Sequence, residues 1–348
     1  MSAQSPIIIG EGRLLIDRAD QITTKKMRWL WPKRIPLGTI TTFAGIPGEG
    51  KSLVVADIIS RVTRQHRFPD AENPLDGPAE VLIISGEDDA ETALVPRLEA
   101  AGADLSRIHV VRAVVLNEKS SVPIEREVRL DSDVKKITDT LRDNPAIAFV
   151  VIDPVTDSLG AVSMYKEQEI RALLRPLRSK GIAVLLVAHL NKKEGLAAIH
   201  RVGGAAAFIG LARASWLFAT NQETKQRQMI PLKNNYASRS TPGVVFELEE
   251  VPVRIEDKDE LVPRVKWLGE SDVDANDILD AAILRADAKA VAMEFLKQML
   301  ADGPKEATTV EEAAKQQGIS KRTLRRAKAE LRVESSKPFG PKWMWSLP

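Results

Sequence analysis

Short apolar runs alternate with longer amphipathic stretches from Trp29 to about Phe246. Continuous apolar runs of this length are typical of strands buried on both faces of a mostly parallel sheet. The stretches between them repeat their apolar positions every three to four residues, as helices do. The pattern therefore predicts a doubly wound α/β domain. The predicted strands are 39–44, 81–85, 149–153, 183–188, 214–218 and 228–232, and the predicted helices are 52–64, 91–101, 133–143 and 165–180.

The pattern changes after this domain, because acidic residues become frequent between Glu247 and Asp280. We expect the early part of this stretch to complete the sheet as an edge hairpin and the later part to form a linker or connecting helix. A smaller unit follows. The predicted domains are an N-terminal segment 1–28, an α/β domain 29–250, acidic linker or edge elements 251–285, and a C-terminal domain 286–348.

The C-terminal domain has the pattern of two helices joined by a short turn. Thr308 or Thr309 is placed to cap the first helix, and Gly318 is placed to end it. Ser320 then caps a second helix that runs to about Leu331. This arrangement predicts a helix-turn-helix.

A stretch with prolines and a glycine, 337–345, follows the two helices and ends in an alternation of Trp343 and Trp345. Such a stretch predicts a hairpin, or wing, and hence a small α or α+β domain of the winged-helix kind. The second helix is strongly basic and suits DNA phosphates, although such a face also occurs on modules that bind proteins. The candidate DNA-binding residues on this helix are Lys321, Arg322, Arg325, Arg326 and Lys328.

The amino-acid composition excludes several classes of function. The chain has no cysteine, which excludes disulfides, zinc-thiolate sites and thiol catalysis and fits a reducing cytoplasm. No apolar run approaches the ~20 residues of a membrane span, and the first ten residues do not resemble a signal peptide, so we expect a cytoplasmic protein with no membrane partner. The formal net charge is only +2, so any binding of nucleic acid must come from a local patch.

The most specific motif is a G-x-x-x-x-G-K-[ST] octet between the first predicted strand and the first predicted helix. Backbone N–H groups of such a P-loop surround a phosphate, the lysine faces the β- and γ-phosphates, and the serine hydroxyl binds Mg²⁺. The flanking strand and helix are those that the motif requires. The expected ligands are ATP and Mg²⁺, with Lys51 as a catalytic cation. The residues that would hold the nucleotide are Gly45, Ile46, Pro47, Gly48, Glu49, Gly50, Lys51, Ser52 and Leu53.

Three further polar side chains follow predicted strands. Asp153 ends one strand, where it is placed to bind Mg²⁺ together with Ser52. Glu87 follows another and is a candidate base for the attacking water, whereas its neighbours Asp88 and Asp89 suit a helix cap. His189 ends a third strand, where it is placed either to sense the γ-phosphate or simply to complete a strand end.

A polar loop follows His189 and carries Lys192 and Lys193. These lysines are placed to touch DNA or a neighbouring subunit, unless the loop is simply a solvated surface. Trp29 and Trp31 precede the first strand, and for them we favour packing in the core over stacking on bases.

Together these segments resemble the RecA-like hexameric ATPases related to the RepA helicases of plasmids and phages, with the DnaB-type replicative helicases as more distant relatives. One departure is Ala205, where many such proteins carry serine. The segments that carry the resemblance are Trp29–Pro32, Arg34–Gly38, the P-loop, Ser85–Asp88, Val151–Pro154, Ala188–Lys192, Arg201–Ala206, Ala212–Trp216 and Leu232–Asn235.

The resemblance implies a RecA-like fold and a ring, with a hexamer as the expected assembly and ATP held between subunits. It implies that a neighbour supplies an arginine finger, for which Arg213 is the first candidate and Arg201 the second, with Lys233 as an accessory cation. The implied function is an ATP-driven replicative DNA helicase of a plasmid, phage or other mobile element, with single-stranded DNA in the ring. Two alternatives stay open: a DNA-bound regulatory or loading ATPase that assembles on ATP without unwinding, and a DNA-binding regulator with a relic nucleotide site.

Overall fold

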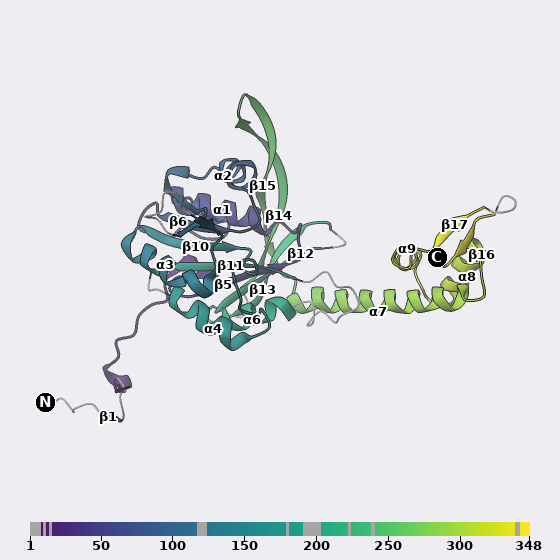
Figure 1. Ribbon diagram of the computed structural model, residues 1–348, viewed down its shortest axis with the longest axis horizontal. Coiled ribbons are helices and arrows are strands. Elements are labelled where there is room, and N and C mark those ends of the chain that lie inside the picture. Colours follow the sequence, from purple (N-terminus) through teal and green to yellow (C-terminus); the bar gives the residue numbers. More distant parts are fainter. Residues whose placement is uncertain are drawn as a thin grey trace.

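The computed structural model describes residues 16–116, 124–178, 181–190, 203–221, 224–237, 241–337 and 342–348, together with two short strands, β1 (Ile8–Ile9) and β2 (Gly12–Arg13). Of residues 203–205 and 276–288 it describes the backbone alone. Figure 1 shows a sheet domain from which helix α7 (Ala275–Leu300) leads to a smaller C-terminal unit. None of the helices in these ranges is long and apolar enough to cross a membrane.

A nine-stranded sheet forms the large domain, in the order β15-β14-β13-β12-β5-β11-β10-β6-β7. The strands from β12 to β7 in this order are all parallel to their neighbours, and β13, β14 and β15 add antiparallel pairs at one edge. The predicted mostly parallel sheet is confirmed. Its strands are β5 (Ile40–Gly45), β6 (Glu80–Ser85), β7 (Ile108–Val111), β10 (Ile147–Asp153), β11 (Ala183–His189), β12 (Ala214–Thr220), β13 (Arg227–Asn234), β14 (Gly243–Ile255) and β15 (Lys258–Ser271).

Helices cover both faces of this sheet, as Figure 1 shows for α1 and α2 on one face and α4 and α6 on the other. Alternate residues of β10 enter different cores: Phe149 and Val151 pack with α1, whereas Val150 and Ile152 pack with α3, α4 and α6. This alternation follows from the period of two along a strand, and it confirms the doubly wound arrangement. The helices are α1 (Lys51–Arg64), α2 (Val95–Ala100), α3 (Leu130–Asp143), α4 (Glu167–Leu174) and α6 (Gly203–Leu211).

Two predicted helices differ in their bounds. The helix predicted at 91–101 begins with a π turn, Ala90–Leu94, before α2. The helix predicted at 165–180 is shorter, because α4 ends at Leu174 and a 3-10 turn, Arg175–Leu177, follows. That turn contains a proline, which has no N–H to continue the α-helical pattern. Strand β7 (Ile108–Val111), at the edge of the main sheet, was not predicted. Nor were the small elements without a strong pattern: β1, β2, β3 (Trp29–Trp31), β4 (Ile35–Pro36), β8 (Val114–Leu116), β9 (Ile124–Arg126) and the 3-10 turns Ala19–Gln21 and Leu105–Arg107.

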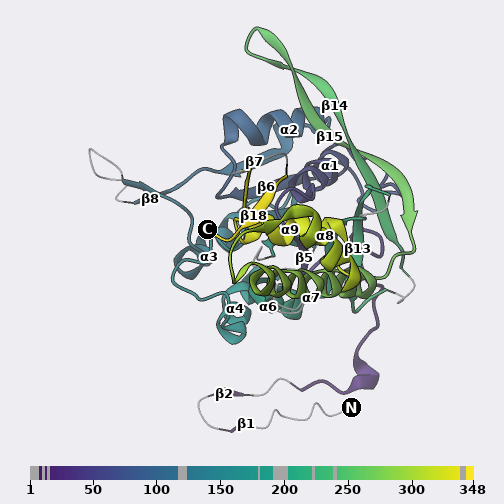
Figure 2. The same ribbon diagram turned by 90° about the vertical axis from the view of Figure 1, so that its right-hand side faces the viewer.

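The acidic stretch begins with a long hairpin of β14 and β15, which extends the sheet as predicted. Only Val244–Phe246 of β14 pair with β13, so the rest of the hairpin continues past the sheet as a two-stranded arm. Figures 1 and 2 show this arm rising beside α1 and α2. Strand β14 runs through residue 250, so the predicted boundary of the α/β domain falls within a strand of this arm.

The segment before the P-loop strand is structural. Trp31 is fully buried, stacks on Phe68 at 5.1 Å between ring centroids, and donates a hydrogen bond from Nε1 to Asp70. Arg34 is also fully buried, forms an ion pair of 2.7 Å with Asp70, and lies over the ring of Trp216. The preference for core packing over base stacking is therefore confirmed for Trp31.

The C-terminal unit has a core of its own, formed by α7, the two following helices and a three-stranded antiparallel sheet. Ser320 caps α9 by accepting a hydrogen bond from the Thr323 N–H, and Gly318 has a φ of 76°, both as predicted. The predicted threonine cap of α8 is wrong, because β16 leads straight into the helix and Glu306 occupies the cap position without a side-chain bond. The elements are β16 (Lys305–Glu306), α8 (Ala307–Gln316), α9 (Lys321–Glu330), β17 (Glu334–Ser336) and β18 (Met344–Ser346).

Candidate active site

The P-loop joins β5 to α1, as the motif requires. Gly48 and Gly50 have φ angles of 90° and 87°, a region that side chains with a Cβ rarely occupy. A Cβ on Gly45 would lie 2.7 Å from the carbonyl oxygen of Phe218, so this position has no room for one. The strand, turn and helix therefore bring the N-terminus of α1 to the end of the sheet, where it can bind an anion.

Lys51 is buried at the base of this loop. Its ammonium donates hydrogen bonds of 2.9 Å to the carbonyl oxygens of Gly45 and Ile46. Burial lowers the pKa of Lys51 to about 8, while the carboxylates of Asp153, Glu49 and Glu87 act in the opposite direction. A desolvated cation of this kind has a strong electrostatic interaction with a phosphate that enters the loop.

Asp153 ends β10 beside the first turn of α1. Burial raises its pKa, and a hydrogen bond from the Ser52 side chain opposes that rise. A hydroxyl and a carboxylate are hard oxygen ligands, and Mg²⁺ commonly takes one or two protein ligands together with water and substrate phosphate oxygens. Ser52 and Asp153 thus fit Mg²⁺. Within the described ranges, no cluster of three or more histidine, aspartate or glutamate side chains is placed to hold a metal by itself.

Glu87 and His189, which are 102 residues apart in sequence, meet at this edge of the sheet. Nε2 of His189 lies 3.2 Å from Oε2 of Glu87. The Glu87 side chain is 64% exposed and that of His189 is 28% exposed, so the pair is open to solvent on the side of Glu87. A partly exposed carboxylate beside an imidazole is suited to accept a proton from water.

The neighbours of Glu87 have other partners. Asp88 forms an ion pair of 2.5 Å with Arg97, and Asp89 caps the following π turn by accepting hydrogen bonds from the backbone N–H groups of Glu91 and Thr92. The cap expected for one of these two aspartates is therefore Asp89. Glu87 is the member of the three whose carboxylate faces the histidine.

A pocket of about 270 Å³ unites these groups. Arg97 of α2 and two residues of the arm, Leu248 and Pro263, also line it, although no sequence pattern pointed to them. Their positions depend on how α2 and the arm pack against the P-loop helix. The lining residues are Pro47, Gly48, Gly50, Lys51, Ser52, Leu53, Glu87, Asp88, Arg97, Asp153, His189, Leu248 and Pro263.

Arg213 and Lys233 lie at the opposite ends of the strands, on the side of the sheet that faces away from the P-loop. The backbone N–H of Arg213 donates to Ile40, at the start of β5, whereas the P-loop follows the end of that strand. The five residues of β5 between these two ends span roughly 16 Å. Arg213 is exposed, and Lys233 donates 2.8 Å to the carbonyl oxygen of Gly210. Burial, followed by the charges of Arg213 and Arg171, lowers the pKa of Lys233.

The predicted DNA-binding residues divide into two groups. Lys192 and Lys193, like the second finger candidate Arg201, lie outside the described residues. On α9, four predicted cations line an open groove of about 480 Å³, whereas Lys328 turns inward and its Nζ lies 4.0 Å from the ring centroid of Trp345. The residues of this basic groove are Lys321, Arg322, Arg325, Arg326 and Ala329.

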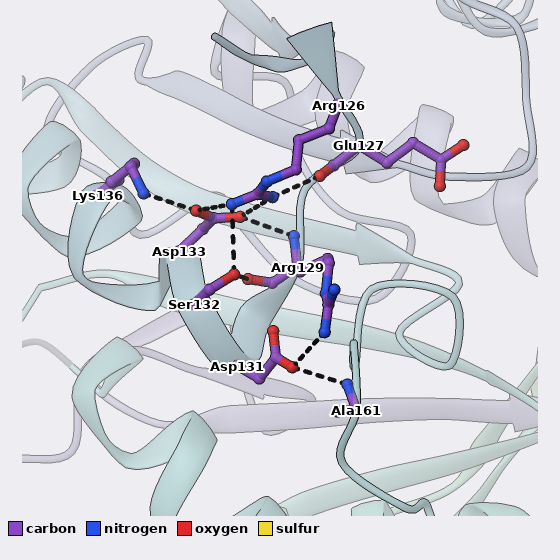
Figure 3. A network of polar contacts seen from close by, with 8 residues as sticks. All are labelled: Arg126, Glu127, Arg129, Asp131, Ser132, Asp133, Lys136 and Ala161. Carbon is purple, nitrogen blue, oxygen red and sulfur yellow. Dashed lines mark hydrogen bonds and ion pairs between the residues drawn. The ribbon is translucent and has the colours of Figure 1, made fainter. Parts of the chain in front are cut away.

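A second carboxylate cluster, at the start of α3, is structural. Asp133 is buried and accepts hydrogen bonds from Arg126 and Lys136, which hold its pKa well below the usual range (Figure 3). Asp131 accepts from Arg129 and from the backbone of Ala161 in the segment after β10. The partners of both aspartates are residues of the same domain. The network therefore anchors the start of α3 to β9 and to the segment after β10.

Comparison with known proteins agrees with this geometry. A family model described as AAA domain matches residues 10–195. The matched span contains the P-loop, Glu87, Asp153 and His189. A search of curated proteins finds no match to the sequence. Because the family model covers more than half of the chain, and the fold and the P-loop geometry agree with it, the chain belongs to the AAA domain family of P-loop ATPases.

Proposed function

We propose that this protein is a ring-forming motor that hydrolyses ATP and acts on DNA, a RepA-like replicative helicase of a plasmid, phage or other mobile element. The observation that carries the proposal is the division of cations between two edges of one sheet. Lys51 lies at the edge that holds the P-loop, and Arg213 and Lys233 lie at the other. Arg213 and Lys233 lie too far from the P-loop to contact a nucleotide bound to their own chain. They are placed to contact a nucleotide bound to a neighbouring copy.

The pocket supports hydrolysis as well as binding. In the proposed mechanism, Lys51 and the backbone of the P-loop hold the phosphates, while Ser52 and Asp153 would hold Mg²⁺, which would neutralise charge on the phosphate oxygens. Glu87 orients the attacking water and accepts its proton, and His189 fixes the carboxylate through the 3.2 Å contact. His189 is also placed to register whether a γ-phosphate is present.

A neighbouring subunit would complete this site. The guanidinium of Arg213 is suited to stabilise negative charge that spreads over the transferring phosphoryl group, an effect of about 10³–10⁵ in rate in other systems. A contact in which one edge of a copy meets the opposite edge of the next is heterologous, and heterologous contacts close into rings when the rotation allows. A hexamer is the assembly we propose.

The C-terminal unit supports an action on DNA. The exposed basic residues of α9 form one continuous groove, and a basic helix that follows a short turn suits the phosphates of a duplex. The winged-helix assignment rests on the same elements, two helices with one strand before them and two after them in a three-stranded sheet. A loading or regulatory ATPase is the second candidate, because the basic groove lies on a unit separate from the sheet domain.

A mixing experiment tests the interfacial site. Lys51→Ala and Arg213→Ala variants should each be nearly inactive alone, since each removes one half of every site. Mixed in equal amounts, they should regain about a quarter of the wild-type ATPase rate, because a quarter of random interfaces combine an intact Lys51 with an intact Arg213. No recovery in rings shown to exchange subunits would contradict action between subunits.

Unwinding of forked DNA tests the motor itself. The wild-type protein should separate the strands in an ATP-dependent manner, and single-stranded DNA should stimulate its ATPase. Intact ATPase activity that is insensitive to single strands, together with no unwinding, would exclude the helicase and favour the loading ATPase.

A further inference from the structure

The side chains that line the nucleotide pocket are of two chemical kinds. One set is polar and comprises the lysine, serine, carboxylates and histidine described above, together with Arg97. The other set, called the apolar half of the lining, is formed by Pro47 and Leu53 of the P-loop and first helix and by Leu248 and Pro263 of the arm. Phosphates require the polar set, so the apolar half is left for the nucleoside.

The arm is held firmly beside this pocket. Leu248 and Leu53 are both partly buried and pack against the same hydrophobic core. Further along the arm, Val253 and Val262 are buried against Ala100 at the end of α2. Contacts with this core and with the end of α2 hold the arm in place, so its two apolar side chains already line the pocket in this structure.

The four side chains of the apolar half carry no hydroxyl, amide or charge. Hydrogen bonds from a site to a polar group of its substrate are what reject a close analogue by about 10⁴–10⁵, whereas apolar contacts discriminate by only about 10–200-fold. A base that packs against this half therefore gains affinity through contacts with the faces of its ring. The polar groups at the edge of the base find no hydrogen-bonding side chain there.

We propose that the root of the arm, Leu248 and Pro263, is the nucleoside-binding wall of this ATPase, and that the enzyme recognises the triphosphate and not the identity of the base. The inference rests on the proposed function, because it takes the P-loop pocket as the site of nucleotide hydrolysis. Its substrate class is accordingly nucleoside triphosphates with purine or pyrimidine bases. The arm, which extends from the edge of the sheet, thereby becomes part of the active site.

Steady-state kinetics of the full-length protein with ATP, GTP and CTP test this proposal, with inorganic tripolyphosphate as a competing ligand that has no nucleoside. The three kcat/KM values should agree within about 10-fold. Leu248→Ala and Pro263→Ala should each raise KM for all three substrates by about 3- to 10-fold and leave the inhibition constant of tripolyphosphate unchanged. Leu261→Ala is the matched control, because this leucine lies on the same arm, is 65% exposed and does not line the pocket.

The outcomes separate the two proposals. A preference for ATP of 100-fold or more, with tripolyphosphate still competing, would overturn the inference and leave the ATPase site intact. Equal loss of tripolyphosphate and ATP binding in both arm variants, with unchanged melting temperatures, would show that the arm supports the phosphate site and would also overturn the inference. If neither tripolyphosphate nor any nucleotide binds to the wild-type protein, the proposed function fails and the inference fails with it.

Discussion

Replacing Glu87 by glutamine removes the proposed base while keeping the shape of the side chain. The structure limits what this change can do to stability. The described contact of the carboxylate is the 3.2 Å approach to His189, and 64% of the side chain is exposed. Exposed pairs of this kind contribute at most about 1 kcal/mol, so the free energy of unfolding should change by no more than that.

The effect on catalysis should be much larger. Loss of a positioned general base lowers kcat by about 10²–10⁴, which corresponds to about 3–5 kcal/mol in the activation free energy. ATP binding should persist, because the P-loop and Lys51 are untouched. The Glu87→Gln variant is therefore expected to be folded, to bind ATP and to turn over very slowly.

Single-turnover hydrolysis, equilibrium ATP binding and urea unfolding measure the three quantities separately. Glu91→Gln is the matched control, because this glutamate is exposed in the same segment and does not line the pocket. Asp88→Asn tests the neighbouring carboxylate, which Arg97 already holds. Hydrolysis by Glu87→Gln within about threefold of the wild type, with Asp88→Asn more damaging, would refute the assignment and move the base to Asp88.

Three further predictions concern the scaffold of the site. Because the pKa of Lys51 is lowered from 10.5 to about 8, its ammonium loses its proton as the pH rises through 8, so tripolyphosphate affinity measured by calorimetry should fall there and should stay flat in Lys51→Arg. Gly45→Ala should lower the free energy of unfolding by about 1–3 kcal/mol in urea, because its Cβ would meet a backbone carbonyl, whereas Gly77→Ala, with open space around it, should be nearly neutral. Asp70→Asn leaves the fully buried Arg34 without its anion and should cost about 3–5 kcal/mol by the same measurement, and a loss below 1 kcal/mol would contradict that account.

Local patterns predicted the central sheet well because its strands are continuous apolar runs. The rule that ligands bind at the carboxyl ends of parallel strands predicts that Glu87, Asp153 and His189 lie at one edge of the sheet. The rule does not specify which side chains touch. That Glu87 contacts His189, while Asp88 turns to Arg97, depends on the path of the loop after β6 and on the position of α2.

Other features could not be predicted, because the charge of a residue and the local sequence pattern around it do not show its tertiary contacts. Arg34 looks like a surface residue in the sequence, yet it is fully buried between aromatic rings and paired with Asp70. Leu248 and Pro263 lie in a stretch whose acidic composition suggested a sheet edge and a linker. Their place in the nucleotide pocket arises from the packing of a long hairpin against α1 and α2, which is a tertiary effect.

We propose that the pocket around Lys51 hydrolyses ATP with Mg²⁺. The most direct test is the rate of phosphate release from ATP by the purified full-length protein, measured with Mg²⁺, with a chelator in its place, and for the Lys51→Ala variant. We predict steady turnover by the wild type that requires Mg²⁺ and falls to background in Lys51→Ala. Turnover by Lys51→Ala equal to that of the wild type would contradict the account.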